Sequence, residues 1–197
     1  MKKRETGQKM TLPETKTLVV KKSTFLKNEL GVITKQSFRK GQKLFDVTGQ
    51  IQSQQTKYSF AMGLNKHIEP QRNDGSSDFG HYFNHSCDPN AMIHIVDKNV
   101  ITPYIEVIAR KNIKTGEELT FDYASLEYDV TIANSVCKCN TLECRGVIYG
   151  FKNLPNHIIK KYKKEGLISN YLIQIYQHKQ KKNISKSKPH QSLELKV

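Results

Sequence analysis

The sequence of 197 residues has no tryptophan, only four cysteines and no long run of apolar residues. A membrane-spanning helix needs about 18 or more consecutive apolar residues, and no stretch of the chain approaches that length. The opening segment, MKKRETGQKMTLPETK, carries positive charge with no apolar stretch behind it, which argues against a secretory signal. We therefore expect a cytoplasmic or nuclear protein without a membrane anchor.

Acidic residues are scarce at both ends of the chain, and this explains most of the formal net charge of +14. Residues 1–17 contain five basic and two acidic side chains, and residues 151–197 contain eleven lysines and only two acidic side chains. Residues 18–150 are nearly balanced, with 16 basic and 14 acidic side chains. The positive charge belongs to the two arms, and we expect the Lys-rich tail to contact nucleic acid or an acidic surface of a larger particle.

Internal repeats and an alternation of strands with helices are also absent, which argues against a parallel doubly wound sheet. From Leu18 the chain contains short segments in which apolar residues alternate or form short runs between glycines, as is typical of strands. These segments are TLVV, LGVIT, KLFDVTGQI, KYSFAM, AMIHIV, PYIEVIA and EELTFDY. They predict a mostly β fold, and the chain length fits one main domain with appendages.

The spacing of the apolar residues changes after residue 150. Apolar residues at helical spacing predict two short helices, with Gly166 as the stop between them. Their apolar faces consist of Ile158, Ile159 and Tyr162 in the first helix and Ile168, Tyr171, Leu172, Ile175 and Tyr176 in the second. From Gln177 onward an apolar face is lacking, so we expect a disordered tail there and a flexible arm at residues 1–17.

The four cysteines are Cys87, Cys137, Cys139 and Cys144, and three of them lie within eight residues. Because thiols stay reduced in a cytosolic protein, such a group indicates a zinc site more than a disulfide framework. Tetrahedral zinc takes four ligands, and Cys87 would complete the set if its loop folds back against CKCNTLEC. Isolated reduced cysteines, or a site completed by a histidine, remain the alternatives.

The loop around Cys87 reads HYFNHSCDPN, residues 81–90, and its residue types alone allow three interpretations. His85 and Cys87 are metal-ligand types, and they could also form a nucleophile and its base. Asn84 and Asn90 could instead be simple turn formers. The rest of the sequence has to decide between these interpretations.

Three motifs occur in order along the chain, FNHSCDPN, then GEELTFDY, then CKCNTLECRG. In this order and spacing the sequence resembles the SET-domain protein lysine methyltransferases, and its cysteines resemble their post-SET zinc-binding cluster. Weaker similarity includes ELGVITKQSFRKGQKLFDVTGQI and KYSF, so the resemblance covers roughly residues 18–150. One departure is visible, because the first glycine of the family's Gly-x-Gly turn is Glu29 here and only Gly31 remains.

The resemblance implies a SET fold of small antiparallel sheets, in which the segment ending at Tyr123 threads the loop at residues 84–90 in a knot-like arrangement. A zinc-bound post-SET loop and short C-terminal helices would follow. The expected parts are a flexible basic arm at 1–17, a catalytic SET domain at 18–128, a post-SET segment at 129–150, a helical segment at 151–176 and a tail at 177–197.

The cofactor that the resemblance implies is S-adenosylmethionine. Asn84 and His85 match the pair that contacts the adenine end of this cofactor, and Gly31 matches a point of close backbone approach. Structural zinc would be held by Cys87, Cys137, Cys139 and Cys144. Zinc binding would then be part of folding the cofactor pocket.

The implied reaction is displacement at a sulfonium methyl by a neutral lysine amine, which depends mainly on alignment and needs no dedicated strong base. Tyr123, the last residue of TFDY, is the expected catalytic residue and also borders the cofactor. Tyr58 is expected in the lysine channel. Phe121 is expected to permit di- or trimethylation, because it lacks the hydroxyl with which a tyrosine would hold a water. Asp122 is expected to face away and support the loop.

The expected substrate is a lysine of a histone or another basic protein, which would bind as an extra strand at an exposed sheet edge. The alternative function is that of a non-enzymatic, zinc-stabilised nucleic-acid-binding protein, which the net charge alone favours. That alternative needs neither Tyr123 nor the pair Asn84 and His85, and it leaves the nearly neutral core unexplained. A third hypothesis keeps the fold but loses activity through the departure at Glu29.

Overall fold

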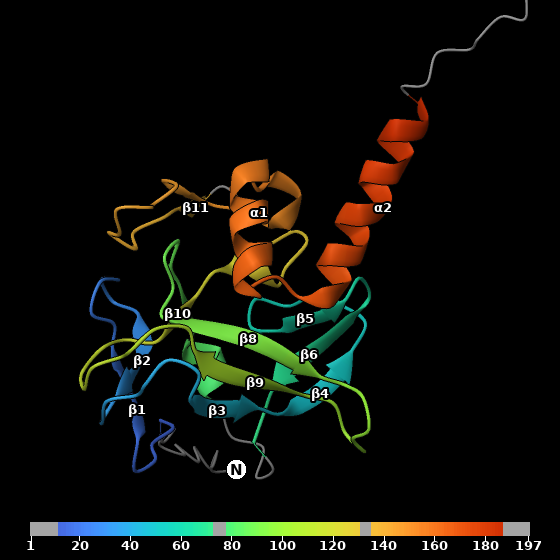
Figure 1. Ribbon diagram of the computed structural model, residues 1–197. Helices are drawn as coiled ribbons and strands as arrows, with labels where there is room; N and C mark the ends of the chain where they lie inside the picture. Colours follow the sequence, from blue (N-terminus) through green and yellow to red (C-terminus); the bar gives the residue numbers. More distant parts are fainter. Residues whose placement is uncertain (1–11, 73–77, 131–134, 187–197) are drawn as a thin grey trace, which may run out of the picture.

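The computed structural model describes residues 12–72, 78–130 and 135–186, whose strands form several small sheets (Figure 1). Two sheets have three strands each, and all strand pairs within them are antiparallel. The strands of the first sheet are, in spatial order, β3 (Lys43–Val47), β9 (Tyr104–Ala109) and β8 (Ala91–Val96). Those of the second sheet are β4 (Gly49–Gln52), β6 (Lys66–Pro70) and β5 (Phe60–Gly63).

Three further sheets have two strands each. They are β1 (Leu18–Lys22) with β2 (Leu30–Thr34), β11 (Ser135–Val136) with β12 (Val147–Ile148), and β7 (Asn84–His85) with β10 (Thr120–Phe121). The first two pairs are antiparallel, whereas β7 and β10 run parallel and bring His85 opposite Phe121. The predicted fold class, mostly β with small antiparallel sheets and short C-terminal helices, is confirmed.

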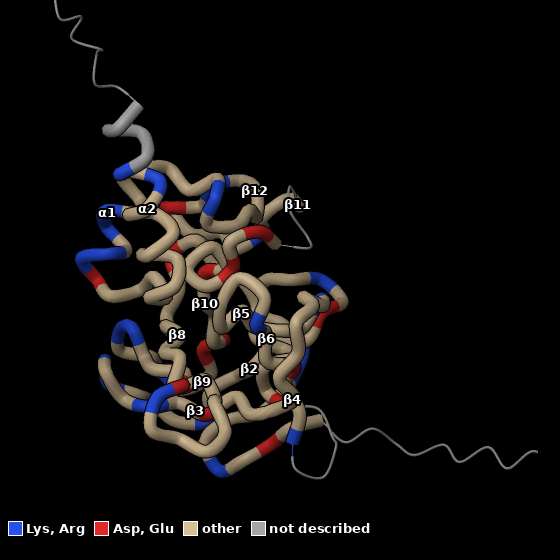
Figure 2. The backbone as a smooth tube through the Cα atoms, turned by 90° about the vertical axis from the view of Figure 1, so that its right-hand side faces the viewer, with Lys and Arg blue, Asp and Glu red and all other residues tan. Residues whose placement is uncertain are grey.

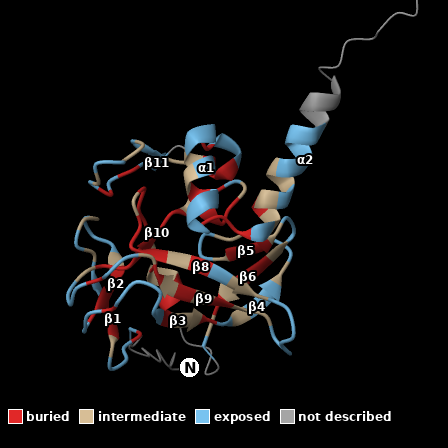
Figure 3. Cartoon of the chain, in the orientation of Figure 1, coloured by how far each residue is buried: buried red, intermediate tan, exposed pale blue. Residues whose placement is uncertain are grey.

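The core follows from the alternation of apolar residues along the strands. In β9, Ile105, Val107 and Ala109 are buried, and the residues between them are partly exposed. This two-residue period is expected for a strand that packs one face against a core. Buried residues of β1, β2, β3, β5, β6 and β8 complete the same cluster, and Figure 3 shows how burial is concentrated in the strands.

The helices α1 (Asn156–Glu165) and α2 (Asn170–Lys186) follow the sheets. As predicted, Gly166 ends α1: its φ of 68° is left-handed, and its N–H bonds to the carbonyl oxygens of Tyr162 and Lys163. Glycine adopts this conformation without a side-chain penalty. Both helices pack into a second apolar cluster, in which Tyr162 and Leu172 are fully buried.

The structure differs from the sequence prediction at both ends and in several strands, among them β6, β7, β11 and β12. Residues 12–17 were assigned to a flexible arm, yet Pro13 is buried and its carbonyl oxygen accepts a bond from the N–H of Val20. The tail was expected from Gln177, yet α2 continues to Lys186, because Lys and Gln favour helix without needing an apolar face. Strand β6 was not predicted, since Lys66, His67 and Pro70 dilute its apolar pattern.

Both C-terminal helices contain lysine positions, which are the blue segments of the backbone tube in Figure 2. Helix α1 carries four lysines, at positions 160, 161, 163 and 164. None of the helices in the described ranges is long and apolar enough to cross a membrane. Residues 1–11 and 187–197, to which the sequence analysis assigned the outer parts of the two arms, lie outside the described residues.

Candidate functional site

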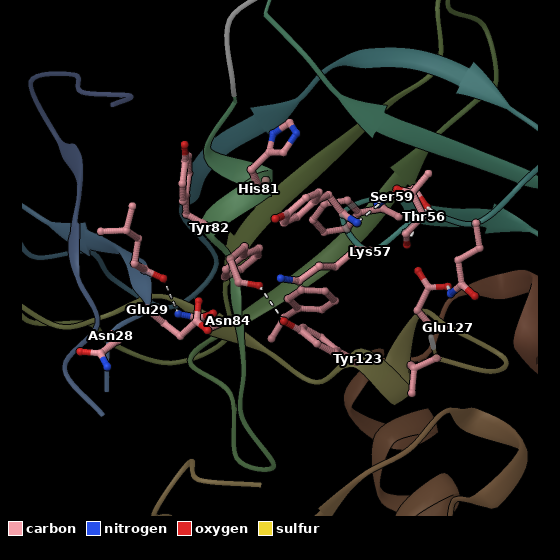
Figure 4. A pocket seen from close by; sticks show the side chains of 18 residues that line it. Asn28, Glu29, Thr56, Lys57, Ser59, His81, Tyr82, Asn84, Tyr123 and Glu127 are labelled. Carbon is pink, nitrogen blue, oxygen red and sulfur yellow. Dashed lines mark hydrogen bonds between the residues drawn. The ribbon is translucent and has the colours of Figure 1, made fainter. Parts of the chain in front are cut away.

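A cavity of about 490 Å³ lies where the loop before β2, the segment before β5, the turn before β7 and the segment after β10 meet. Figure 4 shows the side chains that surround it. Among its lining residues are four that the sequence analysis singled out, namely Tyr58, Asn84, Phe121 and Tyr123. Glu29, the departure from the resembling family, lines the cavity as well. Gly31 and His85 are not among the lining residues.

Tyr123 begins a short 3-10 turn (Tyr123–Ser125), which Asp122 separates from β10. Its hydroxyl donates a hydrogen bond to the carbonyl oxygen of Phe83 at 3.3 Å, and its ring lies against Phe121 and His85, with centroids 4.9 and 5.1 Å away. Burial, followed by the negative charge of Glu29, raises the pKa of the Tyr123 hydroxyl above its usual value. The side chain is therefore a neutral phenol, and it lines the cavity.

An apolar wall stands beside Tyr123. The ring of Phe121 stacks on Phe60 at 5.4 Å between centroids and tilts against Phe83 at 4.8 Å. All three rings are at least nine-tenths buried and line the cavity. Tyr58 lies at the outer part, with 42% of its surface exposed, next to the imidazole of His81 at 5.1 Å. The cavity thus combines an apolar inner wall with an aromatic residue at its outer part.

Asn84 is held from two sides. Its Nδ2 donates to the carbonyl oxygen of Leu30 at 2.8 Å and to Oε1 of Glu118 at 2.7 Å. The buried Glu118 carboxylate also accepts bonds from the hydroxyls of Ser23 and Thr24. These contacts fix the Asn84 amide at the end of the cavity that Glu29 and Leu30 line.

Glu118 also explains why residue 31 is a glycine. A Cβ atom at Gly31 would lie 2.2 Å from Oε1 of Glu118, which is far inside van der Waals contact. The close approach that the sequence analysis expected at Gly31 is therefore made by the Glu118 side chain. Sequence reasoning did not identify Glu118, although it lies within the GEELTFDY motif.

His85 faces away from the cavity lining and toward the cysteines. Its Nδ1 accepts a bond from the N–H of Tyr123 at 3.3 Å, and its Nε2 lies 3.4 Å from Sγ of Cys87. Burial lowers the pKa of His85 to about 4, so the imidazole is neutral. Because Nδ1 accepts, the ring proton is on Nε2 and points to Cys87. His85 thus connects the catalytic candidate Tyr123 with the cysteine cluster.

The structure brings together all four cysteines. The Sγ atoms of Cys87, Cys137, Cys139 and Cys144 lie within 4.8 Å of one another. Those of Cys87 and Cys137 are 3.7 Å apart. A tetrahedral zinc ion with Zn–S bonds of about 2.3 Å separates its sulfur ligands by roughly 3.8 Å, so the spacing fits zinc. Backbone N–H groups of Arg145 and Gly146 point at the Cys87 and Cys144 sulfurs, as suits thiolates.

Asp122 connects this cluster with the rest of the fold. The carboxylate is only 1% exposed and accepts two bonds from Arg145, at 2.6 and 2.8 Å. The Tyr162 hydroxyl of α1 donates to the same carboxylate at 2.7 Å and also contacts the carbonyl oxygen of Cys87 at 3.1 Å. Asp122 supports the loop, as expected, but sequence reasoning missed both partners: Tyr162 was assigned only to an apolar face.

Comparison with known proteins gives one matching family. The family model described as SET domain matches residues 29–124. Histone-lysine N-methyltransferase Su(var)3-9 of Drosophila pseudoobscura pseudoobscura is 28% identical over 144 residues, which cover 66% of this chain and 22% of that protein. Histone-lysine N-methyltransferase SUV39H2 of Bos taurus is 30% identical over 152 residues, covering 68% of this chain and 35% of that protein.

A shorter match to SUV39H2 of Xenopus tropicalis is 37% identical over 83 residues, covering 34% of this chain and 20% of that protein. The chain thus spans between a fifth and about a third of the length of these relatives. Among solved structures, a chain in that of ctPRC2 in complex with H3K27me3 and H3K27M is 24% identical, with a TM-score of 0.47. That alignment covers 56% of this chain and 15% of the other.

Proposed function

Because the chain carries a SET domain over residues 29–124, we propose that it is a protein-lysine N-methyltransferase that uses S-adenosylmethionine as methyl donor. The observation that carries this proposal is one cavity of about 490 Å³ lined by Tyr123, Phe121, Tyr58 and Asn84. These residues come from three separate segments of the chain, and the nucleic-acid-binding alternative does not account for their meeting at one cavity. Protein substrates with an accessible lysine, histones among them, are the substrate class.

The methyl donor would supply an electrophilic methyl group on a sulfonium. Tyr123 then orients the incoming amine, because its hydroxyl hydrogen is directed to the carbonyl oxygen of Phe83 and its lone pairs remain free to accept an amine N–H. The rings of Phe60 and Phe121 exclude water from the reacting groups. Exclusion of water disfavours the cationic form of the lysine and lowers its pKa, so that the neutral nucleophile becomes accessible.

The four cysteines are proposed to hold a structural zinc ion, which their spacing and the N–H donors at Cys87 and Cys144 support. Its function would be to hold residues 137–146 against the cofactor end of the cavity. The connection runs from Cys87 through His85 to the N–H of Tyr123. A second connection runs from Arg145 to Asp122.

The proposed activity is tested by incubating the protein with labelled S-adenosylmethionine and a mixture of histones and cell lysate. Labelled protein bands that yield methyllysine on hydrolysis are the expected result. The experiment also identifies the substrate, because the label marks the protein that was modified. Binding of nucleic acid without any transfer of label would instead support the alternative function.

Asn84→Ala is expected to weaken binding of S-adenosylmethionine about tenfold or more while leaving the fold intact. The substitution removes an amide that is proposed to bond to the cofactor, and it also removes the contacts of that amide with Leu30 and Glu118. The expected loss of binding free energy is on the order of 1–2 kcal/mol, and about 1.4 kcal/mol corresponds to a tenfold change in affinity. Titration calorimetry measures the affinity. Asn112→Ala, at an exposed position outside the cavity, is the matched control, and unchanged affinity in Asn84→Ala removes Asn84 from the site.

Phe121→Tyr is expected to shift the product from di- and trimethyllysine toward monomethyllysine without abolishing the first transfer. A tyrosine hydroxyl would hold a water in the space where a partly methylated amine must turn. One hydrogen-bonded water contributes roughly 1 kcal/mol, which corresponds to about a fivefold change in relative rate. Mass spectrometry of a peptide over time measures the product states. If the unaltered protein stops at monomethyllysine with excess cofactor, Phe121 does not control the outcome.

A further inference from the structure

Glu127 is a buried carboxylate to which the sequence analysis assigned no role. It is 7% exposed, and its backbone N–H donates to the carbonyl oxygen of Tyr123 at 2.8 Å. Its side chain lines the same cavity as Tyr123, as Figure 4 shows. It also lines a second cavity of about 270 Å³, bordered by β5, β6 and α2. Glu127 and Gln55 are shared by both linings and therefore lie between the two cavities.

The carboxylate is held firmly but its charge is not neutralised by its donors. Oε1 accepts a bond from the N–H of Ala61 at 2.7 Å, and Oε2 accepts one from the side-chain amide of Gln55 at 2.8 Å. Both donors are neutral amides. A glutamine would satisfy the Ala61 bond equally well without the cost of burying a charge, so these bonds alone do not account for a carboxylate here. Its position suits a cation that enters the cavity.

The substrate of the proposed reaction is such a cation. A lysine side chain arrives as an ammonium ion and must lose one proton before its nitrogen can attack a methyl group. The Tyr123 hydroxyl is a poor acceptor for that proton, because its hydrogen is retained: burial and Glu29 raise its pKa. Burial raises the pKa of Glu127 to about 7, partly offset by the bonds from Ala61 and Gln55. A carboxylate of that basicity accepts protons better than an ordinary one.

Resting on the proposed methyltransferase function, we propose that the Glu127 carboxylate accepts the proton of the substrate ammonium, directly or through one water. The N–H bond of the ammonium breaks, its electron pair stays on nitrogen, and the proton forms an O–H bond on Glu127. The neutral amine then takes the methyl group and becomes a methylated cation, while the donor's sulfonium becomes a neutral thioether. Glu127 must release its proton to solvent before the next transfer.

The second cavity offers the route for that release. His67 lines it, is buried, and has an Nδ1 atom without a hydrogen-bond partner among the described residues. Burial lowers the pKa of His67, so its imidazole is neutral near pH 7 and has a lone pair to accept a proton. A proton that leaves Glu127 through the second cavity does not pass the end of the first cavity at Asn84, where the cofactor is proposed to bind.

Other titratable groups share these cavities or pack against Glu127. They are Glu29, Lys57, Tyr58, His81, Tyr82 and Tyr123 in the first cavity, and His67, Tyr128, Asp129 and Tyr171 in the second. Tyr171 has its pKa raised by burial and by Glu127 itself, so it stays protonated. Asp129 is paired with Lys152 at 2.6 Å. Glu127→Gln therefore removes one defined group and leaves these in place.

The test compares the pH dependence of methyl transfer in the unaltered protein and in Glu127→Gln. Near pH 7.5 the variant is expected to be slower by a factor on the order of a hundred, the typical contribution of a positioned base. The deficit should shrink as the pH approaches about 10, where the substrate amine loses its proton to solvent. It should also shrink with a peptide carrying S-aminoethylcysteine, whose amine is less basic than lysine. Glu106→Gln, on β9 outside both cavities, is the matched control.

A measurement that needs no turnover accompanies the kinetics. Because burial raises the pKa of Glu127 to about 7, some of the Glu127 side chains carry a proton near pH 7. A bound ammonium expels that proton, so peptide binding to the unaltered protein should release a fraction of a proton. Calorimetry in buffers of different ionisation enthalpy counts these protons, and Glu127→Gln should release none. Glu127→Asp, which keeps the carboxylate, should retain part of the release and of the rate.

The outcomes separate the two proposals. If the unaltered protein methylates lysine and Glu127→Gln keeps both its rate at pH 7.5 and its proton release, the role of Glu127 is overturned and the methyltransferase function stands. A deficit that is the same at all pH values and for both peptides also overturns it, because it indicates a structural effect. If the unaltered protein neither binds S-adenosylmethionine nor transfers a methyl group, the proposed function itself fails.

Discussion

Tyr123→Phe is expected to slow methyl transfer about a hundredfold or more while leaving the affinity for S-adenosylmethionine nearly unchanged. The change removes the one hydroxyl that is proposed to orient the amine, and such a contact would matter mainly in the transition state. The ring keeps its packing against Phe121 and His85, and the backbone N–H of residue 123 keeps its bond to Nδ1 of His85. Rate and binding should therefore separate, which initial-rate kinetics and calorimetry together measure.

The matched control is Tyr104→Phe, on β9 and outside the cavity, which should behave like the unaltered protein. Equal activity in Tyr123→Phe and the unaltered protein would show that Tyr123 is only a packed aromatic residue. A parallel loss of cofactor affinity and rate would point to a damaged cofactor end of the cavity instead of lost orientation of the amine.

Cys144→Ser is expected to release the metal and to weaken cofactor binding together, by tenfold or more. A serine hydroxyl keeps its proton at neutral pH and replaces a thiolate poorly as a zinc ligand. Zinc binding in small cysteine sites contributes on the order of 10 kcal/mol or more, so its loss should free the segment that carries Arg145. Without Arg145 the buried Asp122 carboxylate would lose its paired cation, which is costly.

Elemental analysis of the purified protein should give about one zinc ion per chain for the unaltered protein and close to none for Cys144→Ser. Ser135→Ala, an exposed position on β11 of the same segment, should retain the metal. Metal-free protein with full affinity for S-adenosylmethionine would contradict the proposed connection between the cysteine cluster and the cavity.

Much of the site could be predicted because its residues lie in three short motifs whose order is distinctive. The motifs lead to Asn84, Phe121 and Tyr123 at the cavity, and to the cysteines that come together at the other end of the loop. The β fold was equally predictable, because strands such as β9 alternate buried and partly exposed residues. Motifs and alternation of this kind can be read directly from the amino-acid sequence.

The parts that could not be predicted depend on contacts between distant segments. The Glu127 carboxylate is positioned by bonds from Ala61 and Gln55, which lie more than 60 residues away in the sequence. Gly31 is explained by the side chain of Glu118, which comes from another distant segment. Tyr162 looked like one more apolar helix residue, yet its hydroxyl reaches Asp122 across the second cluster. No spacing rule within a single segment reveals such pairs, since they are set by how the segments pack.

The central claim is that the cavity around Tyr123 transfers methyl groups to lysine. The most direct test incubates the unaltered protein and Tyr123→Phe with excess S-adenosylmethionine and histone or lysate substrates, then counts methyllysine and S-adenosylhomocysteine by mass spectrometry. The account predicts equal amounts of transferred methyl and demethylated cofactor with the unaltered protein, and about a hundredfold less of both with Tyr123→Phe. Folded, cofactor-saturated protein that forms neither product on any substrate would contradict it.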